Sequence, residues 1–214
     1  MVVHATGCVY EGVRFSRLGV SATVMQLRFC TRRLSTGAGD RLITLAKSLT
    51  ASKQTVALAE TSSGGMMATE LLALRGASAF FKGGVVAYSK GAKEVLLGLD
   101  PAKSKPTAGE AHALELARAA RDHLGSDWAI GETGVAGPTA NSHGVAPGVC
   151  ALAVVGPDGA KRSTTLWPDD GLGAADAYGQ APKVGRRDAM QAFAAAGLEL
   201  LCEAIAAEEA KRAP

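Results

Sequence analysis

A strand-to-helix turn at residues 54–69 limits the folds that this chain can adopt. The run from Gln54 to Ala59 has the β-type residues of a short buried strand, and it stops at Glu60 before three hydroxyl residues and two glycines. Helix-type residues follow from Met66 to Leu74, and Gly64 and Gly65 let the backbone turn tightly between the two segments. Such a turn brings hydroxyls and N–H groups to a helix N-terminus, where an anion or a developing oxyanion is stabilised. The same composition is also that of a loop whose hydroxyls cap a helix.

Strand-type and helix-type segments continue to alternate beyond this turn. The patterns predict helices at 40–52, 65–74, 90–97, 108–124 and 188–209, and strands at 54–59, 80–89, 127–133, 148–155 and 161–167. The last two predicted strands, 148–155 and 161–167, have the pattern of a hairpin, so one strand is expected to run antiparallel. Along the helix at 108–124 we expect an inner stripe of Ala111, Leu114, Ala117, Ala120 and Leu124. The chain is therefore predicted to form an α/β fold, a three-layer α/β/α sandwich with a mixed, mostly parallel sheet.

Composition agrees with one such domain, expected at residues 40–214. The chain has 214 residues, of which 47% are apolar and only 5% aromatic, so one sizeable core is expected. No run of about 18 apolar residues occurs, so no membrane span is predicted. Cys150 and Cys202 have distant spacing and apolar neighbours, which indicates buried thiols rather than a disulfide framework. The four histidines form no pair at metal-ligand spacing, so no metal is expected: His4, His112, His123 and His143.

The first 39 residues have a different composition from the rest. They contain five arginines, no lysine and the single acid Glu11, which leaves 18 of the chain's 23 basic and 19 of its 20 acidic residues in the domain. The small net positive charge of the chain, +3, thus comes from these first 39 residues, called the leader below. No nucleic-acid surface is therefore predicted on the domain. An Arg-rich, acid-poor leader is typical of an organellar transit peptide, and Arg32-Arg33-Leu34-Ser35 is similar to a mitochondrial processing site. We expect mitochondrial targeting of residues 1–39; the alternatives are a plastid, or an inert tail on a cytoplasmic protein.

A second unusual loop follows the predicted strand at 127–133. Residues 134–144 are too rich in glycine for regular structure and too short for a linker. Both this loop and the hydroxyl turn follow strands at their carboxyl ends, where open parallel sheets bind ligands. The sequence therefore predicts a small-molecule site between the two loops, for a ligand with a phosphate or a carbonyl group.

A hydroxyl in the first loop needs a base to become a nucleophile. His143 is one candidate, although a histidine among Asn and Ser in a loop is more often solvated. Lys90 and Lys93 follow a predicted strand, and a partly buried lysine with a lowered pKa can serve as a base. The simpler interpretation of either lysine is a surface charge on a short helix.

Two other charged segments have both a functional and a structural interpretation. Glu60 lies at the end of its strand. It is either a site residue or a structural carboxylate that holds the second loop through that loop's N–H groups. Arg186-Arg187-Asp188 can meet a phosphate through an arginine, or can simply be a helix start with a favourable acid.

Four motifs in order give the domain a family resemblance: A-E-T-S-S-G-G at 59–65, G-A-S-A-F-F-K-G-G-V-V-A-Y-S at 76–89, T-G-V-A-G-P at 133–138 and G-R-R-D-A at 185–189. Together they resemble the CinA carboxy-terminal domain family over residues 40–210. The resemblance implies a nicotinamide-nucleotide amidase, a hydrolase that converts nicotinamide mononucleotide to nicotinate mononucleotide and ammonia. It also implies no cofactor, a hydroxyl nucleophile assisted by lysine, and a homo-oligomer, dimer or trimer.

The resemblance also assigns roles to residues. The family usually reads A-E-S-C-T-G-G, so its nucleophilic serine falls on Thr61 and its cysteine on Ser62; Tyr88-Ser89-Lys90-Gly91-Ala92-Lys93 lines up with a Y-S-N-E-A-K pattern and favours Lys93 as base. Expected catalytic residues are Thr61, or Ser62 if the turn is rotated, and Lys93. Expected substrate-binding residues are Glu60, Ser63, Gly64, Gly65, Tyr88, Thr133, Gly134, Gly137 and Arg187, the last as a phosphate contact. N–H groups near Ser63 and Gly64 would hold the oxyanion.

Three function classes follow from these residues. The leading expectation is an amidohydrolase of a pyridine nucleotide, with a small-molecule nucleotide as its partner and no membrane or nucleic acid. The threonine at the nucleophile's place also allows a nucleotide-binding module without catalysis, because its extra methyl group crowds attack. An oligomeric scaffold of the same fold is the third.

Overall fold

The computed structural model describes residues 36–100, 102, 104, 108–167 and 185–212. It also contains two short strands near the N-terminus, β1 (Gly12–Val13) and β2 (Val24–Met25), which pair antiparallel. The expected transit peptide, the processing site at 32–35 and the polar segment at 168–183 lie outside the described residues, apart from these short strands and the start of the first helix.

Five strands form one mixed sheet, in the order β4-β3-β5-β6-β7. They are β3 (Val56–Glu60), β4 (Phe81–Val86), β5 (Trp128–Gly134), β6 (Cys150–Val155) and β7 (Lys161–Leu166). Strand β3 pairs parallel with both β4 and β5, whereas β6 is antiparallel to both β5 and β7. The prediction of a mostly parallel sheet with one antiparallel strand is confirmed.

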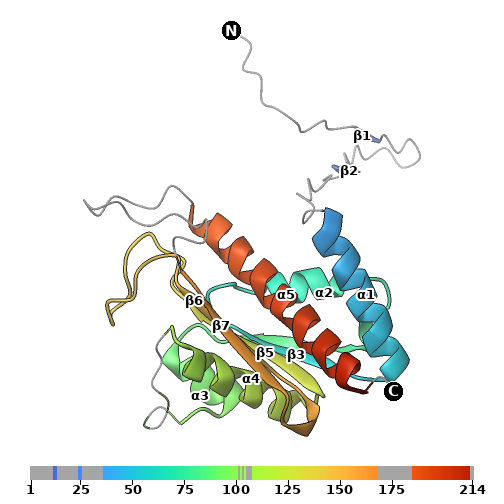
Figure 1. The fold of residues 1–214 in the computed structure, drawn as a ribbon. Coiled ribbons are helices and arrows are strands. Elements are labelled where there is room, and N and C mark those ends of the chain that lie inside the picture. The colour runs from blue at the N-terminus through green and yellow to red at the C-terminus, as the bar shows by residue number, and fades with distance from the viewer. Residues whose placement is uncertain are drawn as a thin grey trace.

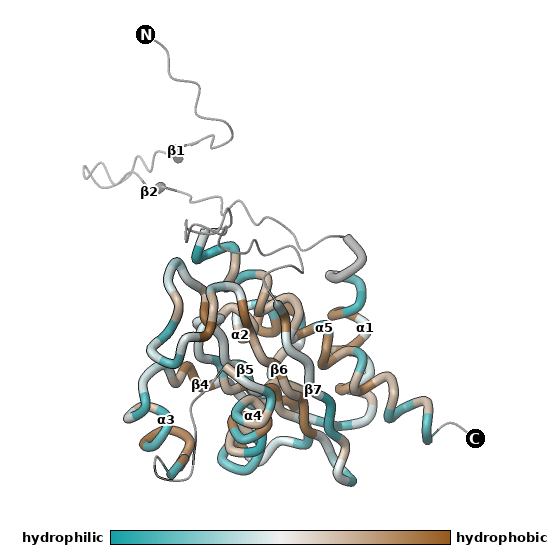
Figure 2. Tube along the Cα trace, turned by 60° about the vertical axis from the view of Figure 1, so that its left-hand side comes forward, coloured by the Kyte–Doolittle hydropathy of each residue, from teal (hydrophilic) through white to brown (hydrophobic). Residues whose placement is uncertain are grey.

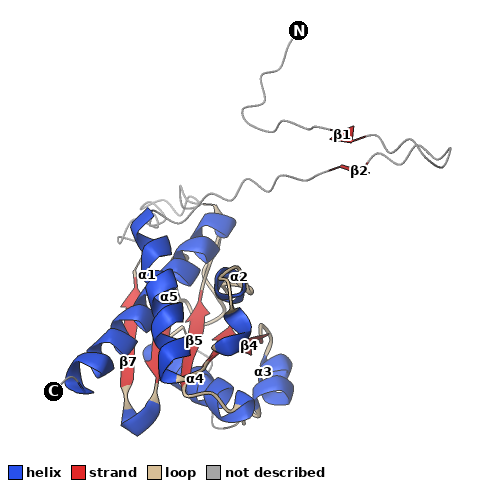
Figure 3. Cartoon of the chain, turned by 90° about the vertical axis from the view of Figure 1, so that its right-hand side faces the viewer, coloured by secondary structure: helices blue, strands red, loops and turns tan. Residues whose placement is uncertain are grey.

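Helices cover both faces of this sheet and complete the three layers (Figure 1). Helices α1 (Thr36–Ser52), α2 (Met66–Leu72) and α5 (Arg186–Arg212) lie on one face, and α3 (Lys90–Leu97) and α4 (Glu110–Leu124) lie on the other. Figure 3 looks onto the face of the sheet that α1 and α5 cover. Strand β3 is buried along its whole length because helices cover it on both sides. The predicted α/β/α sandwich is confirmed.

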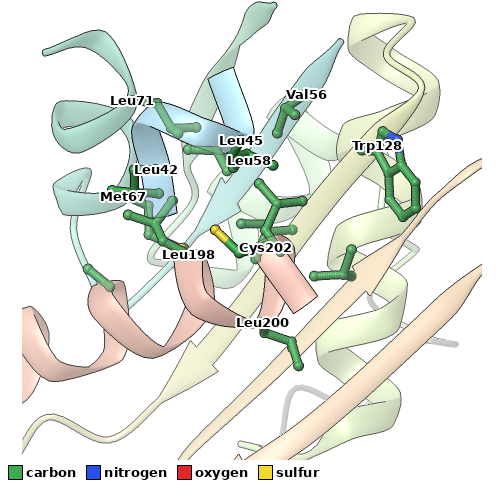
Figure 4. Packing of buried hydrophobic residues seen from close by; sticks show 14 of the residues in the cluster. Leu42, Leu45, Val56, Leu58, Met67, Leu71, Trp128, Leu198, Leu200 and Cys202 are labelled. Atoms are coloured by element: carbon green, nitrogen blue, oxygen red, sulfur yellow. The ribbon is translucent and has the colours of Figure 1, made fainter. Parts of the chain in front are cut away.

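The larger core lies between the sheet and the α1, α2, α5 layer. Figure 4 shows side chains from all three helices meeting those of the sheet: Leu42, Leu45, Met67, Leu71, Leu198 and Cys202 around Val56 and Leu58. The opposite core contains small residues, such as Ala57 and Ala59 of β3 against Ala117 and Ala120 of α4. In Figure 2 the hydrophobic residues follow β6 inside the molecule and hydrophilic residues cover α4. Alanine-rich packing lets α4 approach the sheet closely.

The buried face of α4 differs from the predicted stripe. Ala117 and Ala120 are buried as expected, but Ala111 is exposed, and His112, Ala113 and Leu116 are buried instead. The physical reason is the contact with β5, where Gly131 has no side chain and the backbone of Ala113 and Ala117 fills that space. That contact sets the rotation of the helix, and it turns His112 inward.

The last helix and the two cysteines belong to the core. By length and mean hydropathy alone α5 is apolar enough to cross a membrane, but core helices also meet this test, and half of the apolar stretch is buried inside the domain. Phe193, Leu198 and Leu201 of α5 are buried in the larger core cluster. Cys150 and Cys202 are free buried thiols, as predicted. Burial raises the pKa of the Cys202 thiol to about 11, and raises that of Cys150 as well.

Candidate functional site

The two loops singled out by the sequence lie at the same edge of the sheet. The hydroxyl turn (residues 60–65) follows β3, and the glycine loop (residues 134–144) follows β5. Since β3 and β5 are parallel neighbours, with Ala59 opposite Gly131, the carboxyl ends of both strands meet there. The amide of Ala87, just after β4, donates to the carbonyl of Glu60 at 2.9 Å, so the segment leading into α3 borders the same edge.

Glu132 of β5 holds the hydroxyl turn in place. Its Oε2 accepts the backbone N–H groups of Thr61 at 2.8 Å and of Ser63 at 2.9 Å, and also the Ser63 hydroxyl at 2.8 Å. Its Oε1 accepts the hydroxyl of Ser62 and, at 3.6 Å, the thiol of Cys150. The Glu132 side chain is fully buried, so these donors replace the water that an ionised carboxylate requires.

Glu60 supports the same turn from the other side. Its oxygens accept the N–H groups of Gly65, Met67 and Ala68 at 3.0, 3.2 and 2.9 Å. Its Oε2 also lies 2.7 Å from the Ser63 hydroxyl, whose single hydrogen is shared between Glu60 and Glu132. These are N–H groups at the start of α2, not of the glycine loop. The expectation that Glu60 holds the second loop is therefore wrong: Glu60 holds its own turn, and Glu132 ties that turn to the neighbouring strand.

The three hydroxyls of the turn have different partners. Those of Ser62 and Ser63 are bound to buried carboxylates. Among the described residues, none accepts or donates a hydrogen bond at the hydroxyl of Thr61, although the residue is only 6% exposed. A Cβ placed on Gly134 would lie 2.9 Å from Ser62 Oγ, so Ser62 points inward against the strand. Thr61 is thus the hydroxyl of this turn that has no partner among the described residues.

The glycines give the turn its shape and leave one N–H group available. Gly64 and Gly65 have φ values of 66° and 90°, in the region that favours glycine. The N–H of Ser63 is bound to Glu132, and that of Gly65 to Glu60. Within the part of the chain that the structure describes, the N–H of Gly64 has no acceptor, which makes it the better placed of the two predicted oxyanion donors.

Lys93 of α3 lies beside a buried histidine. Its Nζ is 3.2 Å from Nε2 of His112, and Nδ1 of His112 is 2.9 Å from Oε2 of Glu115. Burial lowers the pKa of Lys93 from its ordinary value, while the negative charges of Glu132 and Glu115 act in the opposite direction. Because the charge of Glu132 affects the pKa of Lys93, the lysine interacts electrostatically with the carboxylate that holds the hydroxyl turn. Lys90, by contrast, is exposed.

An arginine joins the remaining segments around the site. Arg186 donates from Nη1 to the carbonyl of Gly137 at 2.6 Å and from Nη2 to the hydroxyl of Tyr88 at 3.2 Å. Tyr88 is 65% exposed, and its ring is therefore accessible to a ligand. Arg187 is exposed and has no ion pair with another described residue. Thr133 is buried in β5 beside Glu132.

Sequence patterns missed several residues of this edge. His112 and Glu115 were not predicted as a pair, because His112 was considered only as a possible metal ligand; their i, i+3 spacing on one helix was the available signal. His143, a candidate base, is exposed, and its N–H donates to Asn141 within the glycine loop. No group of three or more potential metal-binding side chains occurs in the described ranges.

Pockets beside α1 lie away from this edge of the sheet. One, of about 250 Å³, is formed between α1 and α5 and includes Asp40, Ser48 and Cys202. Another lies between α1 and α2 and includes Lys47 and Arg75. Neither contains a residue of the hydroxyl turn or the glycine loop, so neither is the site predicted from the two loops.

Comparison with known proteins gives related sequences. A CinA-like protein of Synechococcus sp. (strain RCC307) is 41% identical over 119 residues, which are 54% of this chain and 28% of that protein. A CinA-like protein of Anaeromyxobacter dehalogenans (strain 2CP-C) is 39% identical over 124 residues, 57% of this chain and 30% of that protein. The matched region is less than a third of the length of these relatives.

Solved structures share the fold. A competence-damaged protein (CinA) superfamily protein from Klebsiella pneumoniae aligns with a TM-score of 0.66 at 22% identity, over 79% of this chain and 98% of that chain. A competence/damage inducible protein from Agrobacterium tumefaciens aligns with a TM-score of 0.66 at 23% identity, over 78% and 94%. The family model for the CinA C-terminal domain matches residues 42–171. The chain therefore belongs to the CinA C-terminal domain family.

Proposed function

We propose that this domain is an amidohydrolase of a pyridine nucleotide, which converts nicotinamide mononucleotide to nicotinate mononucleotide and ammonia. The observation that carries the proposal is the half-buried Lys93, whose pKa is lowered by burial and whose charge interacts with Glu132. A lysine that gives up its proton more readily can act as a general base near neutral pH. Membership of the CinA C-terminal domain family gives further support.

In the proposed reaction Thr61 is the nucleophile. Neutral Lys93 takes the proton of the Thr61 hydroxyl while Oγ1 attacks the carboxamide carbon, and the N–H of Gly64 stabilises the oxyanion. Lys93 then returns the proton to the leaving nitrogen, the C–N bond breaks, and ammonia departs from an ester of Thr61. Water, deprotonated by Lys93, attacks the ester and releases the carboxylic acid, and the proton returns to Thr61.

Substrate binding would use the groups around the same edge of the sheet. Arg187 has no ion pair with another described residue and suits a bidentate phosphate contact. Tyr88 offers an exposed ring for the nicotinamide base. Glu60, Ser63 and Gly65 would contribute by shaping the turn, and Thr133, Gly134 and Gly137 by bordering the ligand from β5 and the glycine loop.

Ammonia release from nicotinamide mononucleotide tests the activity. The wild-type chain should release ammonia and nicotinate mononucleotide in equal amounts, and Lys93→Ala should reduce turnover by about 10³-fold, because it removes the general base. Lys90→Ala is the matched control, since that lysine lies on the same helix but is exposed. Thr61→Val should abolish turnover, whereas Thr61→Ser should keep or increase it. Wild-type turnover no higher than that of Lys93→Ala rejects the amidase.

A nucleotide-binding module without catalysis is the second candidate. The observation that favours it is that the two serines of the turn are bound to buried carboxylates, which leaves only a crowded threonine as nucleophile. Thermal unfolding with a panel of nucleotides and amides separates the candidates, because a ligand that binds the folded state raises its stability. A raised melting temperature without product supports the module. An oligomeric scaffold, the third candidate, would respond to no ligand.

A further inference from the structure

A histidine–glutamate pair on α4, His112 and Glu115, faces the candidate base. Lys93 Nζ, His112 Nε2, His112 Nδ1 and Glu115 Oε2 form a continuous series, with separations of 3.2 Å and 2.9 Å between the side chains. The Ser104 hydroxyl donates to the same oxygen of Glu115 at 2.7 Å and lies 3.3 Å from His112 Nδ1. The side chain of His112 is 1% exposed and that of Glu115 33% exposed. The series therefore runs from the site through the protein to the solvent.

The partners of His112 define its hydrogen-bonding state. Burial and the nearby ammonium of Lys93 lower its pKa, against the opposing effect of Glu115, and this lowering favours the neutral form of the ring. A carboxylate can only accept, so the single ring hydrogen lies on Nδ1 and is donated to Glu115. Nε2 is then an acceptor, and among the described residues its hydrogen-bond donor is an N–H of Lys93.

We propose that His112 and Glu115 are positioning residues for Lys93, and this inference rests on the proposed amidase. A neutral lysine amine has two N–H bonds and one lone pair. Donation of one N–H to Nε2 restricts rotation of the amine and keeps its lone pair available for the hydroxyl proton. When Lys93 becomes an ammonium, the same acceptor and the negative charge of Glu115 stabilise it. Glu132 is the other carboxylate that acts on this amine, from β5.

The state of Lys93 can be measured without any substrate. Trace labelling of the full chain with acetic anhydride across a pH series, read by mass spectrometry of the peptides, gives the pH midpoint at which Lys93 becomes reactive. Glu115→Gln and His112→Leu should both shift this midpoint to lower pH, because each removes a group that stabilises the ammonium. Glu94→Gln, which removes an exposed carboxylate next to Lys93 in the sequence, should leave the midpoint nearly unchanged.

Kinetics of the same variants add a second measurement. If the amidase is active, Glu115→Gln should reduce kcat about tenfold with little change in KM, because the base is less well held while substrate contacts are intact. An unchanged midpoint for Lys93 in folded Glu115→Gln overturns the positioning role, even if the enzyme is active. If the midpoint of Lys93 shifts in Glu115→Gln but the wild-type chain shows no turnover, the positioning role of His112 and Glu115 stands and only the amidase activity is rejected. Since Glu115 is partly exposed, its variant is expected to fold even if His112→Leu does not.

Discussion

Glu132 accepts hydrogen bonds from each of the three hydroxyl residues, Thr61, Ser62 and Ser63. Two of these bonds come from backbone N–H groups and two from hydroxyls, and the buried carboxylate has no water to replace them. One side chain on β5 therefore fixes the conformation of the loop after β3.

Replacing this carboxylate should destabilise the fold. In Glu132→Gln one of the two accepting oxygens becomes an NH₂ donor and the buried donors lose their negatively charged partner, so we expect the free energy of unfolding to fall by about 3 kcal/mol, measured by urea denaturation. Glu94→Gln, at an exposed position, should change it by less than about 0.5 kcal/mol. Equal stability of the two variants would contradict the role given to Glu132.

The lowered pKa of Lys93 predicts how activity depends on pH. The neutral amine is the active base, so kcat/KM should rise with pH until the amine is fully deprotonated. Because burial is the largest effect on this group, the midpoint of the rise should lie below the ordinary lysine value of 10.5. A profile with no rise between neutral pH and that value would exclude Lys93 as the base.

At the scale of elements, α4 and β5 are in direct backbone contact. A Cβ on Gly131 would lie 2.1 Å from the carbonyl oxygen of Ala113 and 2.5 Å from the nitrogen of Ala117. Neither backbone atom can move aside without shifting the helix that carries His112 and Glu115. The absence of one side chain in β5 thus sets the distance and rotation of α4, and with them the surroundings of Lys93.

The added methyl group in Gly131→Ala should therefore destabilise the fold more than an added methyl group in a protein core usually does. We expect a loss of about 3 kcal/mol in the free energy of unfolding, since the added methyl overpacks against backbone. Gly91→Ala is the matched control, because nothing lies within 4 Å of a Cβ at that helical position. It should be neutral or stabilise by up to about 1 kcal/mol. A Gly131→Ala variant as stable as wild type would show that α4 can move away from β5.

Element prediction succeeded where the signals were local. The helix at 90–97 was predicted with its observed bounds, because Ser89 accepts from the N–H of Ala92 and Gly98 ends the helix in a left-handed conformation. The face of α4 was predicted only in part, because seven of the ten positions from Ala111 to Ala120 are alanine or leucine and periodicity alone permits several rotations.

At the scale of the whole molecule, the leader is a separate question from the domain. We propose that residues 1–39 direct the protein to mitochondria, on the basis of their arginine content. A fluorescent reporter fused to residues 1–39 should colocalise with a mitochondrial marker, and replacement of the five arginines by glutamine should leave it in the cytoplasm. Colocalisation with plastids, or no targeting by the intact leader, would reject the proposal.

A homo-oligomer, dimer or trimer, is proposed for the assembled protein. Large apolar side chains are exposed on neighbouring segments of the chain, namely Val86 at the end of β4 and Val95 and Leu96 on α3. Oligomerisation would remove this apolar surface from water. Light scattering of the purified full chain should give a mass of two or three times 21.8 kDa. A monomeric mass at micromolar concentration would contradict the proposal.

The sequence by itself determined the layers, the mixed sheet and the position of both loops. The signals for these features, namely the hydrophobic periodicity of strands and helices, the turn glycines and the helix caps, each depend on only a few neighbouring residues. The sequence also singled out Thr61 and Lys93. Only the tertiary structure decided which carboxylate holds which loop, which hydroxyl is left free, and that His112 and Glu115 face the lysine. Those relations join residues far apart in the chain, and they depend on strand pairing and on a helix rotation set by a single glycine, which no local pattern encodes.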